Sequence, residues 1–192
     1  MPRLPLACLL SAAAGLLNAA DDLRVGYTFG AEEFETDVPG VGHSEHDWDD
    51  SSRITVGLWS VERQMWGLVF VKQDAEYEEP AAKVDFSAIG ARLCVGSAVP
   101  ISQGLVIEFL PYLGWSRTEL DLSWPGGGGS DSSWMWEYGV ELNLAFAVSG
   151  ATGLVVGGGA GYGFTKGEFE IEGTRDLDQQ GLSFNVFVGW RF

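Results

Sequence analysis

The segment from Trp134 to Val148 reads WMWEYGVELNLAFAV and decides the fold class. Every even-numbered position in it is apolar or aromatic, and every odd-numbered position except Met135 is small or polar. Because successive side chains of a β-strand point to opposite faces of the sheet, this segment predicts a strand with one apolar and one wet face. Residues 184–192 repeat the pattern, with Phe187 as the one bulky exception on the polar side.

Weaker versions of the same alternation recur along the chain. Together they give eight candidate strands, at about 21 residues per strand and connection, as an antiparallel up-and-down meander requires. The apolar stripes lie at residues 23–29, 54–58, 66–70, 89–95, 105–115, 134–148, 154–164 and 184–192. We therefore predict an all-β fold.

The connections between these stripes alternate in length. Three are tight and lie near residues 62–64, 100–103 and 150–153. Four are long and polar and run through residues 36–52, 74–83, 119–133 and 168–180. This alternation places the tight turns at one end of a barrel and the long loops at the other. A soluble, lipocalin-like barrel need not segregate its loops and would carry its apolar residues inside.

The lengths of the stripes suit a membrane. A bilayer core offers no water to backbone groups, so only helices or a closed sheet can span it, and about 9 to 11 residues suffice for a tilted strand. No segment offers the ~20 apolar residues of a spanning helix. We predict a closed eight-stranded transmembrane β-barrel whose apolar side chains face lipid.

The first 20 residues have the features of an export signal. Arg3 precedes an apolar stretch at residues 4–17, and small residues precede Asp21. A basic start, an apolar middle and a small-residue cleavage site are typical of a secretory signal. We predict that residues 1–20 are a cleaved signal peptide and residues 21–192 one barrel domain. Cys94 is then the only thiol of the mature chain, so no internal disulfide is expected.

The chain is strongly acidic, with 11 basic residues, 27 acidic residues and a formal net charge of −16. Binding to nucleic acid depends on Lys and Arg displacing the counterions of phosphates, so a nucleic-acid partner is disfavoured. Twenty-one of the acidic residues lie in the long loops or in the strand ends that feed them. The predicted acidic rim would attract cations; selection for solubility alone is the alternative explanation.

In this pattern the chain resembles the small eight-stranded outer-membrane barrels of the OmpA/OmpX type. The resemblance covers residues 21–192, and its most specific part is the final strand, which ends in Phe192 after alternating apolar and aromatic residues. In that family such an ending is read by the barrel assembly machinery, which implies this role for Phe184, Val186, Val188, Trp190 and Phe192. The resemblance also implies a monomer integral to the bacterial outer membrane, in contact with lipid and lipopolysaccharide.

Aromatic residues of the stripes are then candidates for interfacial girdles, where a ring lies half in lipid and half in water. They are Tyr27, Trp66, Trp115, Trp134, Trp136, Tyr138 and Tyr162. Core aromatics of a soluble sheet are the alternative. A second feature of the stripes is a run of glycines on one face of a strand, at Gly157, Gly159, Gly161 and Gly163, which predicts room for bulky interior neighbours or curvature of the wall.

Charged residues on the faces opposite the apolar stripes are expected inside the barrel. An eight-stranded barrel is just wide enough for side chains to fill, and a buried carboxylate is costly unless it is paired. We therefore predict that Glu–Arg bridges plug the lumen; a narrow ion path is the alternative. The residues are Arg24, Arg53, Arg92, Glu108, Glu137, Glu141 and Arg191.

Both histidines of the chain lie in the sequence HSEHDWDD at residues 43–50. Imidazole suits zinc, copper and nickel, so His43, Glu45, His46 and Asp47 are candidate ligands of a divalent metal, with a hydrated acidic loop as the alternative. A lipid-modifying enzyme would need a strand-anchored histidine, and Cys94 has no histidine near it in sequence. We predict no enzyme activity and no cofactor.

The predicted function is a structural or surface-interaction role for a plugged outer-membrane barrel. Its acidic extracellular loops would present a contact surface to partners, with divalent cations as candidate ligands. A narrow pore for small solutes or cations is the alternative.

Overall fold

The structure, a computed structural model, describes residues 20–38, 42–61, 64–79, 82–125, 127–148, 152–171 and 174–192. Apart from Ala20, the predicted signal peptide lies outside the described residues. Among the described residues, no helix has the length and apolarity needed to cross a membrane. The strands are β1 Asp22–Val38, β2 Gly42–Asp47, β3 Asp50–Ser60, β4 Met65–Glu79, β5 Ala82–Ser102, β6 Leu105–Trp124, β7 Gly127–Ala147, β8 Gly153–Glu170 and β9 Thr174–Arg191.

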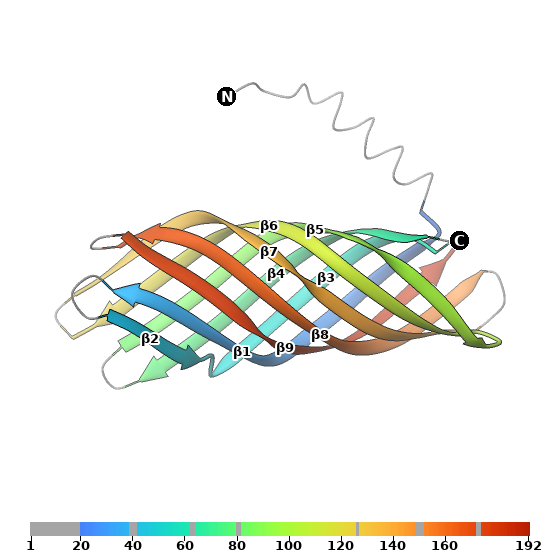
Figure 1. The fold of residues 1–192 in the computed structure, drawn as a ribbon, viewed down its shortest axis with the longest axis horizontal. Helices are drawn as coiled ribbons and strands as arrows, with labels where there is room; N and C mark the ends of the chain where they lie inside the picture. The colour runs from blue at the N-terminus through green and yellow to red at the C-terminus, as the bar shows by residue number, and fades with distance from the viewer. Residues whose placement is uncertain are drawn as a thin grey trace, which may run out of the picture.

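These strands form one closed antiparallel ring (Figure 1). Each strand from β3 to β9 pairs with the next, and β1 closes the ring by pairing with β9 from Asp22–Arg191 to Thr36–Leu177. Residues 33–38 of β1 pair with β2, and residues 22–29 pair with β3. The strands β2 and β3 therefore form one strand of the ring, with a break at Trp48 and Asp49. The prediction of a closed, eight-stranded, up-and-down barrel is confirmed.

The register of the ring is staggered. Following the strand partners once around from Leu23 on β1 leads back to β1 at Glu33, ten residues further along. Such a stagger tilts the strands against the barrel axis and gives an eight-stranded barrel an interior filled by side chains. Asp21 and Phe192 lie together at one end of the barrel, where the Phe192 amide donates to the Asp21 carbonyl at 2.8 Å. We call this end the inner end and the opposite end the outer end.

The apolar stripes face outward. On β7, Tyr138, Leu142 and Phe146 are 42%, 55% and 44% exposed, whereas Met135 and Glu137 are buried. In water this exposed apolar belt would be unfavourable, because folding does not bury it. Contact with lipid tails removes the belt from water. The predicted orientation of the stripes is therefore confirmed.

The strands run far beyond the apolar belt, and this corrects the prediction of long loops. Residues 74–79 and 119–124, predicted as loops, continue β4 and β6. On β4 the outward residues Asp74 and Glu76 are exposed, whereas the inward residues Ala75 and Tyr77 are buried. The polarity of the two faces reverses above the belt because water, not lipid, surrounds the wall there. The acid therefore lies largely on strand faces.

Two glycines of β8 fit closely against large inward side chains, as the sequence predicts. A Cβ added at Gly157 would meet the ring of Phe187, and one added at Gly163 would meet the hydroxyl of Tyr112. The glycines thus leave room for bulky residues that cross the narrow lumen.

Candidate functional site: the barrel interior

Successive side chains of a β-strand point to opposite faces, so every second residue of each strand points into the lumen. Many of these inward residues are charged or polar. The structure buries five of the seven predicted lumen residues at 7% exposure or less, and it leaves Glu141 and Arg191 half-buried. It places the seven in two groups at different levels of the barrel.

The first group, the inner-end cluster, consists of Asp22, Arg24, Glu108 and Arg191. Arg24 donates to both oxygens of Glu108 at 2.8 and 2.9 Å and to Asp22 at 2.9 Å. Arg191 donates to both oxygens of Asp22 at 2.7 and 3.0 Å. Asp22 was missing from the predicted set, although it stands two residues before Arg24 and therefore on the same face.

Aromatic rings enclose the guanidinium of Arg24. Its central carbon lies 4.9 Å from the ring centre of Phe187 and 5.3 Å from that of Trp59. Such cation–π contacts gain strength where water is excluded. Phe187, the exception to the alternating pattern of the last strand, therefore faces inward and packs on a cation.

The second group, the central cluster, contains Glu32, Arg53, Arg92, Glu137 and Glu141. Arg92 donates to both oxygens of Glu137, one of them at 2.8 Å, and to Glu141 at 3.3 Å. Arg53 forms an ion pair with Glu32 and lies 3.9 Å from Glu137. The two ion-pair groups of this cluster are therefore in contact through Glu137.

Glu32 is one of the 21 acidic residues that we assigned to the long loops and the strand ends that feed them, but the structure buries it inside the barrel. Its side chain is 6% exposed, and its Oε2 accepts hydrogen bonds from Ser51 at 2.8 Å, Gln73 at 3.1 Å and Gln179 at 3.0 Å. Even-numbered residues of β1 face inward, as Asp22 and Arg24 do. The same alternation therefore already indicated an inward position for Glu32. A carboxylate with three neutral donors and an arginine is well satisfied for a buried anion.

An apolar layer, the outer apolar cluster, lies above the central cluster. Two residues further toward the outer end, Glu32 is followed by Phe34 and Gln73 by Ala75, and both are buried. The indole of Trp48 stacks on Phe34 with ring centres 4.2 Å apart. The cluster comprises Phe34, Trp48, Ala75, Tyr77, Val84, Phe86, Ala88, Leu120, Met135, Phe169, Ile171 and Leu177.

Sequence reasoning missed this apolar layer. Its signal was the alternation of apolar and acidic residues within 75–79, which was interpreted as a polar loop. Seven of its members are at most 3% exposed: Phe34, Phe86, Leu120, Met135, Phe169, Ile171 and Leu177. The interior therefore carries ion pairs at the level of the apolar belt and closely packed apolar side chains above it.

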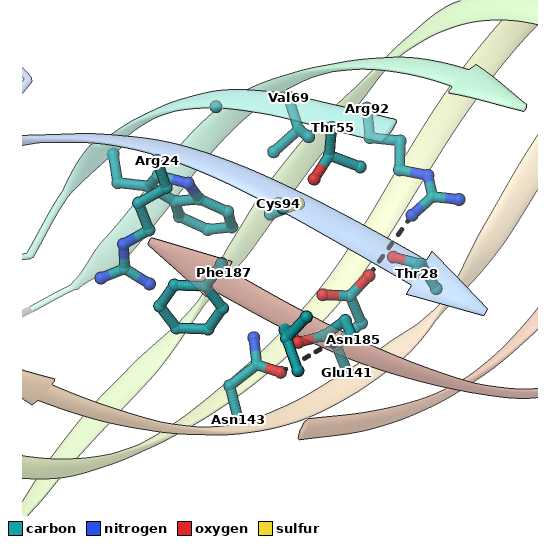
Figure 2. A pocket seen from close by; sticks show the side chains of 14 residues that line it. Arg24, Thr28, Thr55, Val69, Arg92, Cys94, Glu141, Asn143, Asn185 and Phe187 are labelled. Carbon is teal, nitrogen blue, oxygen red and sulfur yellow. Dashed lines mark hydrogen bonds and ion pairs between the residues drawn. The ribbon is translucent and has the colours of Figure 1, made fainter. Parts of the chain in front are cut away.

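Between the two charged clusters lies an internal chamber of about 40 Å³. Figure 2 shows Arg24 at one side of it and Arg92 at the other, with Asn143, Asn185 and Glu141 along the wall. Asn185 donates to Asn143 at 3.0 Å. Cys94 also lines the chamber, as a free and buried thiol.

The predicted metal ligands are only partly described. His46 lies between the rings of Phe34 and Tyr77, and its Nδ1 is 2.9 Å from the Tyr77 hydroxyl. Asp47 is exposed, and the side chains of His43 and Glu45 lie outside the described residues. Within the described part of the chain, no three His, Cys, Asp or Glu residues are grouped as metal ligands.

The aromatic and C-terminal predictions concern the outward face. Trp134 and Trp136 are each 60% exposed, and Tyr27, Trp115, Tyr138 and Tyr162 are also exposed, whereas Trp66 is half-buried. All five residues of the predicted assembly signal point outward on β9 or directly after it: Phe184, Val186, Val188, Trp190 and Phe192. Their recognition by an assembly machinery stays a prediction.

Above the apolar belt, acidic residues of neighbouring strands stand side by side. Glu76 is the strand partner of both Asp50 and Asp85, and Asp85 is also the partner of Asp121. A shallow hollow of about 280 Å³ lies over them. Lys83 donates to Glu76 at 2.9 Å and to Asp85 at 3.1 Å, and these two bonds hold the pKa of Lys83 above its ordinary value.

No family model and no curated protein matches the chain. Solved outer-membrane barrels are similar in fold. Neisserial surface protein A (NspA) matches with a TM-score of 0.51 and 16% identity over 88% of this chain and 97% of that one. The attachment invasion locus protein Ail of Yersinia pestis has a TM-score of 0.43 and 13% identity, over 90% and 99%. The outer membrane protease OmpT of Escherichia coli has a TM-score of 0.48 and 9% identity, over 90% and 97%.

At this identity the similarity to NspA shows the fold alone. The chain has the fold of the small eight-stranded outer-membrane β-barrels.

Proposed function

We propose that this chain is a monomeric integral protein of the bacterial outer membrane whose barrel serves a structural or surface-interaction role. The observation that carries the proposal is the filling of the lumen. The inner-end cluster, the central cluster and the outer apolar cluster occupy successive levels between one end of the barrel and the other. A solute that crosses the barrel would have to break buried ion pairs and also part packed apolar side chains, both of which are costly.

The outer surface supports the interaction part of the proposal. Above the apolar belt the wall carries carboxylates as direct strand partners, such as Asp85 and Asp121. Like charges placed directly opposite each other are destabilising, and a cation or a basic group between them relieves the repulsion. Divalent cations, which also bridge anionic lipid headgroups such as those of lipopolysaccharide, are the proposed ligands of this surface.

Recording of ion conductance across a planar lipid bilayer tests the closed lumen. The purified full chain, reconstituted at a known density, should show no conductance steps above those of a protein-free bilayer. As a positive control, the triple variant Phe34→Ala, Phe169→Ala, Leu177→Ala removes three large buried side chains of the outer apolar cluster and should raise the leak. Regular conductance steps of the native chain would overturn the proposal.

A narrow cation pore is the second candidate. The chamber favours it, because Glu141 lines that space and the two charged clusters contain five carboxylates but four arginines. The same recordings distinguish the two: a pore predicts cation-selective steps that fall when Glu141 is replaced by Gln.

The location is tested by cell fractionation followed by gel mobility before and after heating. A compact band from the outer-membrane fraction that shifts on boiling supports a folded membrane barrel, and solubility without detergent would contradict it. Sequencing of the mature N-terminus tests cleavage of residues 1–20. Deletion of Phe192 tests the assembly signal, since fewer compact barrels should then reach the membrane.

We also propose that the chain is not an enzyme. The imidazole of His46 is hydrogen-bonded to the Tyr77 hydroxyl, so it is not presented to an outside substrate as a base. The thiol of Cys94 is buried in the lumen wall, so it is not presented as a nucleophile. The variants His43→Ala and His46→Ala address both this point and the predicted metal site. Loss of zinc binding in these variants would support the metal site, and loss of a lipid-modifying activity would contradict the absence of catalysis.

A further inference from the structure

Two residues that line the internal chamber between the charged clusters each have a buried polar atom that no described residue satisfies. Arg24 is 4% exposed and uses both terminal nitrogens in ion pairs, but its Nε has no hydrogen-bond partner among the described residues. The Oδ1 of Asn185 is also buried and unpartnered, while its Nδ2 donates to Asn143. Both residues line the chamber. A buried donor and a buried acceptor without hydrogen bonds are each unfavourable, so each calls for a partner, and the chamber that both side chains line offers space for one.

Glu141, on the same chamber wall, is the least satisfied of the five interior carboxylates. Its one ion pair, with Arg92, is long at 3.3 Å, whereas Glu108 and Glu137 each receive two arginine nitrogens. The two clusters contain five carboxylates and four arginines, so one negative charge has no arginine of its own. We assign this charge to Glu141, which lines the chamber. A half-buried carboxylate with a single long ion pair still needs solvation.

The chemistry of the chamber selects one class of ligand. An anion would suit the Nε–H of Arg24 but not the oxygens of Asn185 and Glu141. A cation would suit those oxygens but not a chamber with an arginine on either side. Water both accepts and donates, and Thr28 and Thr55 add hydroxyls to the lining. Because a water needs about 10–15 Å³ of such space, a chamber of this size holds about three.

We propose that the chamber is a binding site for a small cluster of ordered water molecules. One water accepts the Nε–H of Arg24, one donates to Oδ1 of Asn185, and the cluster solvates Glu141. These water molecules therefore link the inner-end cluster to the central cluster. The two charged clusters share no direct ion pair among the described residues. This inference concerns internal hydration and does not depend on the proposed role of the barrel.

Nuclear magnetic resonance of the full, ¹⁵N-labelled chain folded in detergent micelles tests the site. Selective excitation of water in a rotating-frame experiment separates through-space transfer from proton exchange. The Hε of Arg24 should show through-space transfer from water. Asn185→Ala, which enlarges the chamber, should keep that signal, whereas Asn185→Leu, which fills it, should remove it.

An assigned Arg24 Hε without through-space transfer from water would overturn the proposal, and so would a signal that persists in Asn185→Leu. Heat-modifiable gel mobility checks that each variant is folded. If Asn185→Leu does not give a compact band, the spectrum of the native chain decides alone. Conductance in a bilayer is a separate measurement, so failure of the closed-lumen proposal is distinguishable from failure of this one.

Discussion

Arg24 on β1 and Glu108 on β6 meet inside the barrel as a two-pronged ion pair across 84 positions of sequence, with N–O distances of 2.8 and 2.9 Å. These strands are not neighbours in the ring, so the pair spans the lumen. At 4% and 2% exposure, both charges have lost almost all contact with solvent. Each charge is therefore tolerated because the other is present, and Asp22 provides Arg24 with a second carboxylate.

Removing one partner of this pair should lower the free energy of unfolding much more than removing both partners. We expect Glu108→Ala to lower the free energy of unfolding by about 3–5 kcal/mol, because it leaves the buried Arg24 with Asp22 alone, a carboxylate that Arg24 shares with Arg191. The double variant Arg24→Leu, Glu108→Leu should lose clearly less, because Asp22 keeps both hydrogen bonds from Arg191 and no charge of the inner-end cluster is left unpaired. Urea unfolding in detergent micelles, followed by tryptophan fluorescence, measures both values.

The exposed pair of Lys166 and Asp178 is the matched control for that experiment. Its N–O distance is 2.6 Å, but the two side chains are 55% and 42% exposed. Exposed ion pairs contribute at most about 1 kcal/mol. An equal loss from Lys166→Met and Glu108→Ala would contradict the importance of burial.

The close fit of Gly163 against Tyr112 predicts a coupled pair of substitutions. Gly163→Ala places a methyl group against the Tyr112 hydroxyl and should destabilise the barrel by about 1–3 kcal/mol, as overpacking does. Tyr112→Phe removes the atom that clashes, so Gly163→Ala should cost less in that background. A double-mutant cycle of unfolding free energies measures the coupling. A coupling near zero would show that the backbone, not Tyr112, requires the glycine.

The outer end of the barrel should weaken locally in acid. The amide of Glu170 donates to the carboxylate of Asp131 at 2.7 Å, and this bond, with one from the Ser132 amide, lowers the pKa of Asp131 below its ordinary value of 3.8. A group with a lowered folded pKa contributes its stability above the unfolded pKa and loses it as the pH falls through the folded value. Hydrogen exchange should thus show lower protection of the Glu170 amide below pH 3.8. Asp131→Asn should flatten this dependence, and an unchanged slope would contradict the assignment.

Much of this fold was predictable because lipid imposes a simple rule on the wall. Residues such as Leu142 and Phe146 must alternate with small or polar ones, and the period of two leaves no choice of face. The inward position of Arg24, Arg92 and Glu137 follows from the same rule. Their partners do not, because the pairing of β1 with β9 and the ten-residue stagger depend on closure of the whole ring.

The outer half of the barrel was less predictable, because the rule reverses there. Tyr77 and Ala75 alternate with Glu76 and Glu78 at the same period, but now the apolar residues face inward. A search for apolar stripes that face lipid interprets this stretch as polar loop. Ion-pair geometry and the internal chamber were beyond the sequence for another reason: they depend on residues from strands on opposite sides of the lumen.

The boundary between the two halves predicts how an added charge will act along one strand. Leu142 and Ser130 lie on the same outward face of β7, Leu142 within the apolar belt and Ser130 beside Asp121 in the acidic region. Leu142→Arg should destabilise the barrel in a lipid bilayer by about 2–4 kcal/mol, the cost of a cationic side chain near the bilayer midplane. Ser130→Arg should cost almost nothing, because water surrounds it and Asp121 is its partner. Unfolding titrations in phospholipid vesicles measure both variants. Equal effects, or a tolerated Leu142→Arg, would mean that the belt does not face lipid.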